Sequence, residues 1–318
     1  MSSAVSALLL FPATAAFSAT PSIQSVANAA NYQPGIASAT WVAIFGSDLA
    51  SATRQWSGGD FINGNLPTKL DDVQVSINGQ AAFVYFISPG QIDVLARDDA
   101  ATGQVAVVVT NSGGSSSPFM VNKQAVAPAL FAYSQGGGDY AVVQEAGNYA
   151  LVAPTGLLGP TVQTVQAAPG DSVILYATGL GPVTPAQPSG QVVGAPAPTA
   201  SPVQVTVSNQ QATVQFAGII GPGLYQLNIV VPSGASGDVP VVVSVSGESA
   251  ESALMSVQAS TGGQKIAGCL SGQVDSITYS VGELYYGLAD DVSIGGTEFM
   301  RNLQNQAVAF RAIRRAAG

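Results

Sequence analysis

The chain has 318 residues, of which 47% are hydrophobic and only 8% are charged, and its formal net charge is −9. An ordinary soluble protein carries about 25% charged residues, so small polar side chains replace most of the charge here. The negative balance excludes a nucleic-acid partner, whose phosphates require a basic surface. The length has room for two domains and a short extension.

Residues 1–20 have the composition of a secretory leader. An apolar run at 5–11 precedes small residues, in the order of a signal peptide, although no basic residue comes before Arg54. The alternative is a disordered cytoplasmic tail. We expect the protein to be exported to the cell surface or the medium, and no other run approaches the roughly 20 apolar residues of a transmembrane helix.

Residues 21–124 predict a first β-sandwich. An apolar strand at 41–45 is followed by a polar loop at 54–61, and residues 73–77 then alternate apolar and polar side chains. Asn78-Gly79 is a strong hairpin turn before a returning strand at 82–87. Short strands with turns at intervals of 8–12 residues are typical of antiparallel sandwiches.

Residues 125–258 repeat this order at an offset of about 130 to 135 residues, which indicates a tandem duplication. The stretch at 169–185 repeats the one at 34–50, and residues 203–207 repeat 73–77. Two insertions distinguish the second copy. Residues 129–152 predict two extra strands, and the proline-rich loop at 182–202 is expected to lie extended on the surface because proline removes a ladder hydrogen bond.

Residues 259–318 predict a small α+β extension. A strand at 277–281 precedes a helix that begins near Phe299, and this helix carries four of the nine basic residues. It can pack on the second sandwich, touch an acidic partner or another copy of the chain, or bind an anionic membrane surface. The predicted interaction residues of this helix are Arg301, Arg311, Arg314 and Arg315.

Several motifs resemble those of the acidobacterial (Solibacter-type) C-terminal domain family of secreted proteins. The motifs are Ile44-Phe45-Gly46-Ser47-Asp48-Leu49-Ala50, Leu66-Pro67-Thr68, Val75-Ser76-Ile77-Asn78-Gly79, Ile87-Ser88-Pro89-Gly90-Gln91, Leu175-Tyr176-Ala177-Thr178-Gly179-Leu180-Gly181 and Gly223-Leu224-Tyr225-Gln226-Leu227-Asn228. The resemblance covers about residues 25–258. It implies paired immunoglobulin-like sandwiches attached to other exported domains, and it implies no particular activity.

The sequence offers little for catalysis. It contains no histidine, which removes Ser-His-Asp triads and histidine metal sites. The single Cys269 is a poor nucleophile without histidine; it follows Ile266-Ala267-Gly268, a chance match to a lipidation box. We therefore expect no enzyme activity.

Acidic doublets raise the question of calcium, which binds six to eight oxygens. Asp71 and Asp72 are the candidate ligands, but a solvated turn explains them better, and no Asp-x-Asp-x-Asp ladder is present. Two exposed carboxylates about 4 Å apart repel by only about 1 kcal/mol in water. We favour the solvated turn and expect no cofactor.

Aromatic residues supply the remaining candidates. Trp41 lies in an apolar strand and is predicted to belong to the core. Trp56 lies in a polar loop beside Arg54 and Asp60, where an exposed ring could stack on a sugar, or could plug the end of the sandwich.

The sequence therefore predicts a mainly β protein with two tandem immunoglobulin-like antiparallel β-sandwiches and a C-terminal extension that ends in a helix. Its expected role is a non-catalytic exported adhesion or structural module that binds a protein or glycan at the cell surface. The alternatives are a carbohydrate-binding module that uses domain-end loops, and a self-assembling surface subunit.

Overall fold

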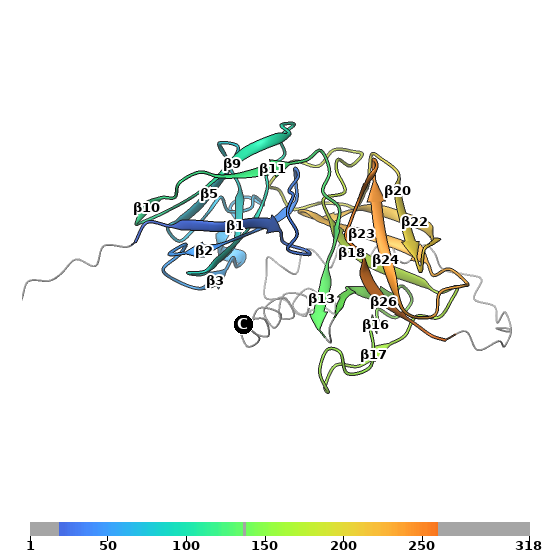
Figure 1. The fold of residues 1–318 in the computed structure, drawn as a ribbon. Helices are drawn as coiled ribbons and strands as arrows, with labels where there is room; N and C mark the ends of the chain where they lie inside the picture. Colours follow the sequence, from blue (N-terminus) through green and yellow to red (C-terminus); the bar gives the residue numbers. More distant parts are fainter. Residues whose placement is uncertain (1–18, 136–137, 260–318) are drawn as a thin grey trace, which may run out of the picture.

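The structure, a computed structural model, describes residues 19–135 and 138–259. The leader at 1–18, Cys269 and the C-terminal extension with its four arginines lie outside the described residues. The described chain is nearly all β, as predicted, and folds into two sandwiches that lie side by side (Figure 1). Within it, no helix is long and apolar enough to cross a membrane.

The first sandwich is built from two antiparallel sheets, here called sheets A and B. Sheet A contains, in order, β1 (Ser22–Asn28), β2 (Trp41–Ser47), β8 (Gln91–Leu95), β7 (Phe83–Ile87) and β3 (Arg54–Gln55). Sheet B contains β10 (Gly114–Ser115), β9 (Gly103–Asn111), β5 (Val73–Ile77) and β4 (Lys69–Leu70), with β11 (Phe119–Lys123) beside β9 and β6 (Gln80–Ala81) beside β5. The short 3₁₀ helix η1 (Gly58–Asp60) follows β3.

The second sandwich also has two sheets, C and D. Sheet C contains β17 (Thr164–Val165), β16 (Leu151–Val152), β15 (Val143–Glu145), β18 (Ser172–Thr178), β23 (Leu224–Val230), β22 (Thr213–Gly221) and β19 (Ala197–Pro198), with β12 (Ala129–Leu130) beside β18. Sheet D contains β13 (Ala132–Gln135), β14 (Gly138–Ala141), β26 (Ala253–Val257), β24 (Gly237–Val245), β20 (Val203–Val207) and β21 (Gln210–Gln211), with β25 (Glu248–Ser249) beside β24. Pairing is antiparallel except between β14 and β26 and between β16 and β17.

The alternating sequence pattern explains the cores. In β5, Val73, Val75 and Ile77 are buried and Gln74 is exposed, because successive side chains of a strand point to opposite faces. The equivalent strand β20 has the same burial pattern. Each sandwich thus has its own apolar core, which is built from residues 26–121 in the first and 126–257 in the second.

The two sandwiches repeat each other in register as well as in strand order. The central strands β2, β8 and β7 of sheet A correspond to β18, β23 and β22 of sheet C. Ala43, Asp93 and Phe86 form a cross-strand row in the first sandwich, and Ile174, Asn228 and Phe216 form the matching row in the second. A bulge precedes both Phe86 and Phe216, so the correspondence extends to local irregularities.

The outer face of sheet C is covered by the insertion at 129–152. Tyr133, Val142, Ile174 and Tyr176 form a second apolar cluster on this face, outside the sandwich core. The Tyr176 hydroxyl donates to Gln144 Oε1 at 2.8 Å, so the polar end of this buried ring is satisfied. Burial raises the pKa of Tyr176 far above its ordinary value.

The buried Lys123, at the end of β11 and just before the linker to the second sandwich, binds groups of Ser38, Asp99 and Ala101. The side chain of Lys123 is 1% exposed, and its Nζ atom lies 3.2 Å from Asp99 Oδ2. The ammonium also donates to the Asp99 carbonyl at 2.7 Å, to Ser38 Oγ at 3.1 Å and to the Ala101 carbonyl at 3.1 Å. Each of its three N–H groups therefore has an acceptor, as a buried ammonium requires.

The linker between the sandwiches is hydrogen-bonded at Ala127 to both of them, to Asn28 of the first and to Gly179 of the second. Asn28 Nδ2 donates to the Ala127 carbonyl at 3.1 Å, and the Ala127 amide donates to the Gly179 carbonyl at 3.0 Å. The interface therefore begins at the linker, and it continues at the proline-rich loop.

The proline-rich loop differs from its prediction. It packs on the first sandwich, because the Leu66 amide donates to the Gly190 carbonyl at 2.8 Å and the Val192 amide donates to the Gly64 carbonyl at 3.2 Å. Pro198 also belongs to a short edge strand, β19, where its missing N–H is tolerated. Proline content indicated irregular backbone correctly, but it carried no information on what that backbone packs against.

Candidate functional site

The predicted ligand-binding residues Arg54, Trp56 and Asp60 lie together at the edge of sheet A. β3 pairs with β7, and the Trp56 amide extends this pairing by donating to the Tyr85 carbonyl at 2.8 Å. The chain then turns through η1, where the Asp60 carboxylate accepts the Ser57 amide at 2.7 Å. Local hydrogen bonds thus fix the loop that carries Trp56.

Arg54 and Asp60 bind each other. The guanidinium donates from Nη1 and Nη2 to the two Asp60 oxygens at 2.9 and 3.0 Å, and from Nε to Asp71 Oδ1 at 2.9 Å. The hydrogen bond from Arg54 holds the pKa of Asp60 below its ordinary value, and the same contact raises the pKa of Arg54. Arg54 thus links Asp60 of the loop to Asp71 outside it, and the bidentate pair stabilises the loop conformation that positions Trp56.

Trp56 belongs to a cluster of four half-buried aromatic rings. Its ring centroid lies 4.9 Å from that of Tyr85, 5.1 Å from Phe61 and 5.8 Å from Trp41, all in edge-on arrangements. Aromatic pairs prefer this geometry. The Tyr85 hydroxyl donates to Gln55 Oε1 at 3.4 Å. Next to the cluster, Ile62, which begins the following turn and pairs with Asn65, is 71% exposed.

Trp41 was predicted to belong to the core; it is half-buried on the outer face of sheet A, where it packs against a small apolar cluster of Leu66, Phe83 and Leu95 and not in the main sandwich core. Its strand neighbours Val42 and Ile44 point inward. The Trp41 indole N–H donates to the Pro222 carbonyl at 3.0 Å, and its backbone amide donates to Thr178 Oγ1 at 3.3 Å. Trp41 is therefore a contact between the two sandwiches.

Phe83 forms a second contact between the sandwiches. The Arg97 guanidinium carbon lies 4.6 Å from the Phe83 ring centroid, a cation–π geometry. Gly190 of the proline-rich loop lies against the same ring, and a Cβ at position 190 would lie 2.0 Å from its Cζ atom. Gly190 also has a φ of +77°, so both its conformation and its surroundings require glycine.

Asp93, in β8 of sheet A, is a buried carboxylate that the sequence patterns did not single out. It is 6% exposed and accepts a hydrogen bond from Gln91 Nε2 at 2.7 Å. Its neighbours Ile92 and Val94 point into the core, so Asp93 points outward. The alternation of Gln91, Ile92 and Asp93 predicts that Asp93 points outward from the core, but nothing in this pattern predicts that the outward face is buried.

Asp71 and Asp72, the candidate residues for the less favoured calcium hypothesis, bind different partners. Asp71 pairs with Arg54, and Asp72 Oδ2 accepts the Ser112 amide at 2.9 Å. Hydrogen bonding with the Ser112 side chain, and then with its backbone amide, lowers the pKa of Asp72. Within residues 19–135 and 138–259, no three carboxylate or thiol side chains gather into a metal-binding group.

Comparison with known proteins gives no family for this chain. No protein-family model matches it, and no curated protein matches it. The resemblance found in the sequence motifs thus stays a prediction.

Several solved structures match at low TM-scores. SGBP-B of the Bacteroides ovatus mixed-linkage glucan utilization locus, in complex with a mixed-linkage heptasaccharide, has 11% identity and a TM-score of 0.31, over 76% of this chain and 46% of that one. A surface glycan-binding protein from Prevotella bryantii has 10% identity and a TM-score of 0.24, over 74% and 42%. The Escherichia coli adhesin FdeC has 13% identity and a TM-score of 0.23, over 75% and 63%. This chain spans less than two thirds of each, and at these values we draw no functional conclusion from them.

Proposed function

We propose that this protein is a non-catalytic adhesion or structural module of the cell surface, in which the two sandwiches act as one rigid body. The observation that carries the proposal is the interface between the sandwiches. It contains the Trp41–Pro222 hydrogen bond, the Phe83–Gly190 contact and the embedded linker at Ala127. These contacts come from separate parts of both sandwiches, so hinge motion would have to break them together.

The chemistry of the chain supports a role without catalysis. The sequence has no histidine, and the charged groups around Arg54 in the candidate site and around the buried Lys123 at the end of β11 are engaged with one another. Arg54 is bound by Asp60 and Asp71, and Lys123 is bound by Asp99 and two carbonyls. Such groups stabilise loops.

Location in the cell tests the proposal. The full chain, expressed with its own residues 1–20 in its natural host, should be recovered in the surface or secreted fraction and should be degraded by protease added to intact cells. A cytoplasmic marker protein controls for lysis. Recovery of the chain with the cytoplasmic marker, protected from added protease, would contradict the proposal.

A second function, carbohydrate binding, is favoured by the edge of the aromatic cluster. Trp56, Phe61 and Tyr85 are half-buried, and the Gln55 amide lies beside Tyr85. Aromatic rings with nearby hydrogen-bonding groups suit ligands that have apolar and polar faces, as sugars do. Arg54 and Asp60 position this edge through their ion pair.

Affinity electrophoresis in gels that contain soluble polysaccharides tests this second function. Binding should retard the full chain, and Trp56→Ala should restore its mobility. Met120→Ala is the matched control, because Met120 is 53% exposed on sheet B, away from this edge. The idea fails if no polysaccharide retards the protein, or if a folded Trp56→Ala variant is retarded as strongly as the wild type.

A further inference from the structure

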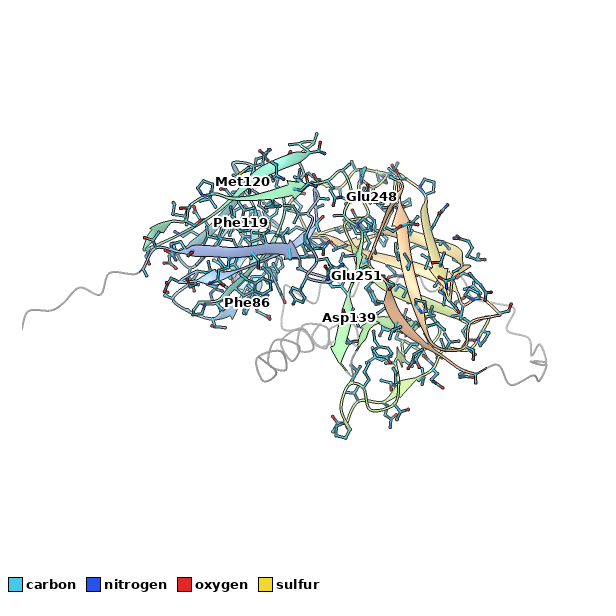
Figure 2. All side chains as sticks on the ribbon, in the orientation of Figure 1. Phe86, Phe119, Met120, Asp139, Glu248 and Glu251 are labelled. Carbon is cyan, nitrogen blue, oxygen red and sulfur yellow. The ribbon has the colours of Figure 1, made fainter. Side chains whose placement is uncertain are left out.

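The aromatic edge at Trp56 and the interface between the sandwiches share one small apolar cluster. The members of this cluster, here called the bridging cluster, are the buried side chains of Leu66, Phe83 and Leu95 and the half-buried rings of Trp41, Trp56 and Phe61. Phe86, which pairs with Gln55 next to Trp56, lies on the side of the first sandwich opposite to Met120 (Figure 2). The edge and the bridging cluster therefore lie on the sheet A side of the first sandwich.

The second sandwich contacts the buried members of the bridging cluster. The Leu66 amide donates to the Gly190 carbonyl at 2.8 Å, and Gly190 also lies against the Phe83 ring. Gly223 lies so close to Leu95 that a Cβ on it would be 2.5 Å from Leu95 Cδ1. Because the rings of the aromatic edge pack on these same side chains, the second sandwich helps to position the rings.

The proline-rich loop of the second sandwich also pairs with the turn that follows Phe61. Asn65 forms an antiparallel bridge with Gln191, and the Val192 amide donates to the Gly64 carbonyl at 3.2 Å. Ile62, at the start of this turn, pairs with Asn65. Backbone pairing thus joins the aromatic edge, the turn and the loop into one stretch of surface that reaches from the first sandwich to the second.

This stretch of surface offers no unengaged charge to a ligand. The turn at 61–68 and the loop at 182–202 contain no charged residue. Beside them, Arg54 binds Asp60, and Arg97 stacks on an aromatic ring of the bridging cluster. The formal net charge of the chain is −9, which repels an anionic ligand. The surface therefore favours a ligand without charge.

The remaining side chains of this surface combine amide groups with apolar groups. Asn63 and Gln191 are exposed, and an amide both donates and accepts hydrogen bonds. Ile62 is 71% exposed, and the half-buried Trp56 and Phe61 lie beside it along the chain. Hydroxyl groups and apolar C–H faces, as in an uncharged polysaccharide, match this combination.

We propose that the two sandwiches together form one composite site for an uncharged polysaccharide chain. The first sandwich supplies Trp56, Phe61 and the turn that begins at Ile62, and the second supplies the loop around Gln191. This inference rests on the carbohydrate binding proposed above as the second function, and it adds the class of ligand and the part played by the second sandwich. Gly190 is a positioning residue in this site, because it holds the loop against the bridging cluster.

Affinity electrophoresis of the full chain tests the class of ligand. The gels contain neutral hydroxyethyl cellulose, glucomannan or dextran, or the anionic carboxymethyl cellulose. At least one neutral polymer should retard the wild type, and carboxymethyl cellulose should retard it less. Stronger retardation by carboxymethyl cellulose would overturn the uncharged class. If no polymer retards the wild type, the carbohydrate function itself fails, and the composite site fails with it.

Two variants test the contribution of the second sandwich. Gln191→Ala removes an exposed amide, so it should bind several-fold more weakly while its melting temperature stays that of the wild type. Gln204→Ala is the matched control, because Gln204 is exposed on sheet D. Gly190→Val should bind several-fold more weakly because it displaces the loop from Phe83.

Gly156→Val is the matched control for Gly190→Val. Both glycines have positive φ, but no atom lies within 4 Å of a Cβ at position 156. Circular dichroism checks the fold of each variant, and Gln191→Ala decides alone if Gly190→Val does not fold. The composite site is overturned if a folded Gln191→Ala or Gly190→Val is retarded like the wild type. If Trp56→Ala is released in the same gels, carbohydrate binding still stands, with its site confined to the first sandwich.

Discussion

Trp41 donates its indole N–H to the carbonyl oxygen of Pro222 at 3.0 Å, across 181 positions of the sequence and between the two sandwiches. Gly223 lies directly beside this contact, and a Cβ there would lie 2.5 Å from Leu95 Cδ1. The turn between β22 and β23 is thus fitted against the end of sheet A. The interface between the sandwiches therefore depends on close packing at Gly223 as well as on the Trp41–Pro222 hydrogen bond.

Replacing Trp41 by Phe should weaken this interface. The substitution leaves the partly buried Pro222 carbonyl without its donor, so the loss should lie near the lower end of the about 1 to 3 kcal/mol that a buried unsatisfied group costs. Urea unfolding, followed by circular dichroism, measures the loss. Trp56→Phe is the control, because that indole packs within the first sandwich. Equal losses for the two variants would show that the hydrogen bond between the sandwiches adds nothing specific.

Gly190→Ala should destabilise the protein more than the same change at Gly156. Both glycines have positive φ, +77° and +81°, so an alanine at either is strained by about 1 kcal/mol or more. Only Gly190 lies against a ring, that of Phe83, whereas a Cβ at Gly156 would meet open space. Overpacking adds about 1 to 3 kcal/mol. If Gly190→Ala and Gly156→Ala shift the denaturation midpoint equally, the close contact between Gly190 and the Phe83 ring is contradicted.

Lys123→Met should be strongly destabilising. Removal of one partner of a buried ion pair leaves the other charge uncompensated, at a cost of about 3 to 5 kcal/mol, and here the remaining charge is that of Asp99. The double variant Lys123→Met/Asp99→Asn should recover part of this loss. Thermal unfolding distinguishes the cases, and a double variant no more stable than the single one would contradict this role for Asp99.

Acid should destabilise the loop that carries Trp56. The folded-state pKa of Asp60 lies below the ordinary value of 3.8, so the unfolded chain takes up this proton first as the pH falls. The stabilisation is therefore complete above pH 3.8 and is lost as the pH falls through the folded-state pKa. Arg54→Met removes the main cause of the shift and should reduce this pH dependence below pH 4. Identical pH profiles of stability for wild type and Arg54→Met would contradict the assignment.

The strands were predictable because their patterns are local. The alternation of Val73, Val75 and Ile77 with polar residues indicates one buried face, and the structure confirms it. The continuous apolar strand around Trp41 was ambiguous, since it is buried on both faces, and only one of them belongs to the sandwich core. The prediction that Trp41 is core therefore could not say which face it occupies, and the structure places it in the smaller cluster on the outer face.

The candidate site was predictable to the extent that it is local in sequence. Arg54, Trp56 and Asp60 come together because one short loop holds them. Phe83, Asp93 and Gly190 were missed, because their contacts or their burial depend on chain far away in sequence. The Asp71-Asp72 doublet raised calcium binding only as the less favoured alternative to a solvated turn, and in the structure these two residues bind Arg54 and Ser112.

The central claim is that the two sandwiches form one rigid body, and a spin-label distance measurement tests it most directly. Labels on Met120→Cys in β11 and Val165→Cys in β17, both exposed positions, report across the interface in a Cys269→Ser background. We expect one narrow distance distribution, which broadens when Gly190→Val is added. A distribution that is already broad without Gly190→Val, and that this substitution leaves unchanged, would contradict the claim.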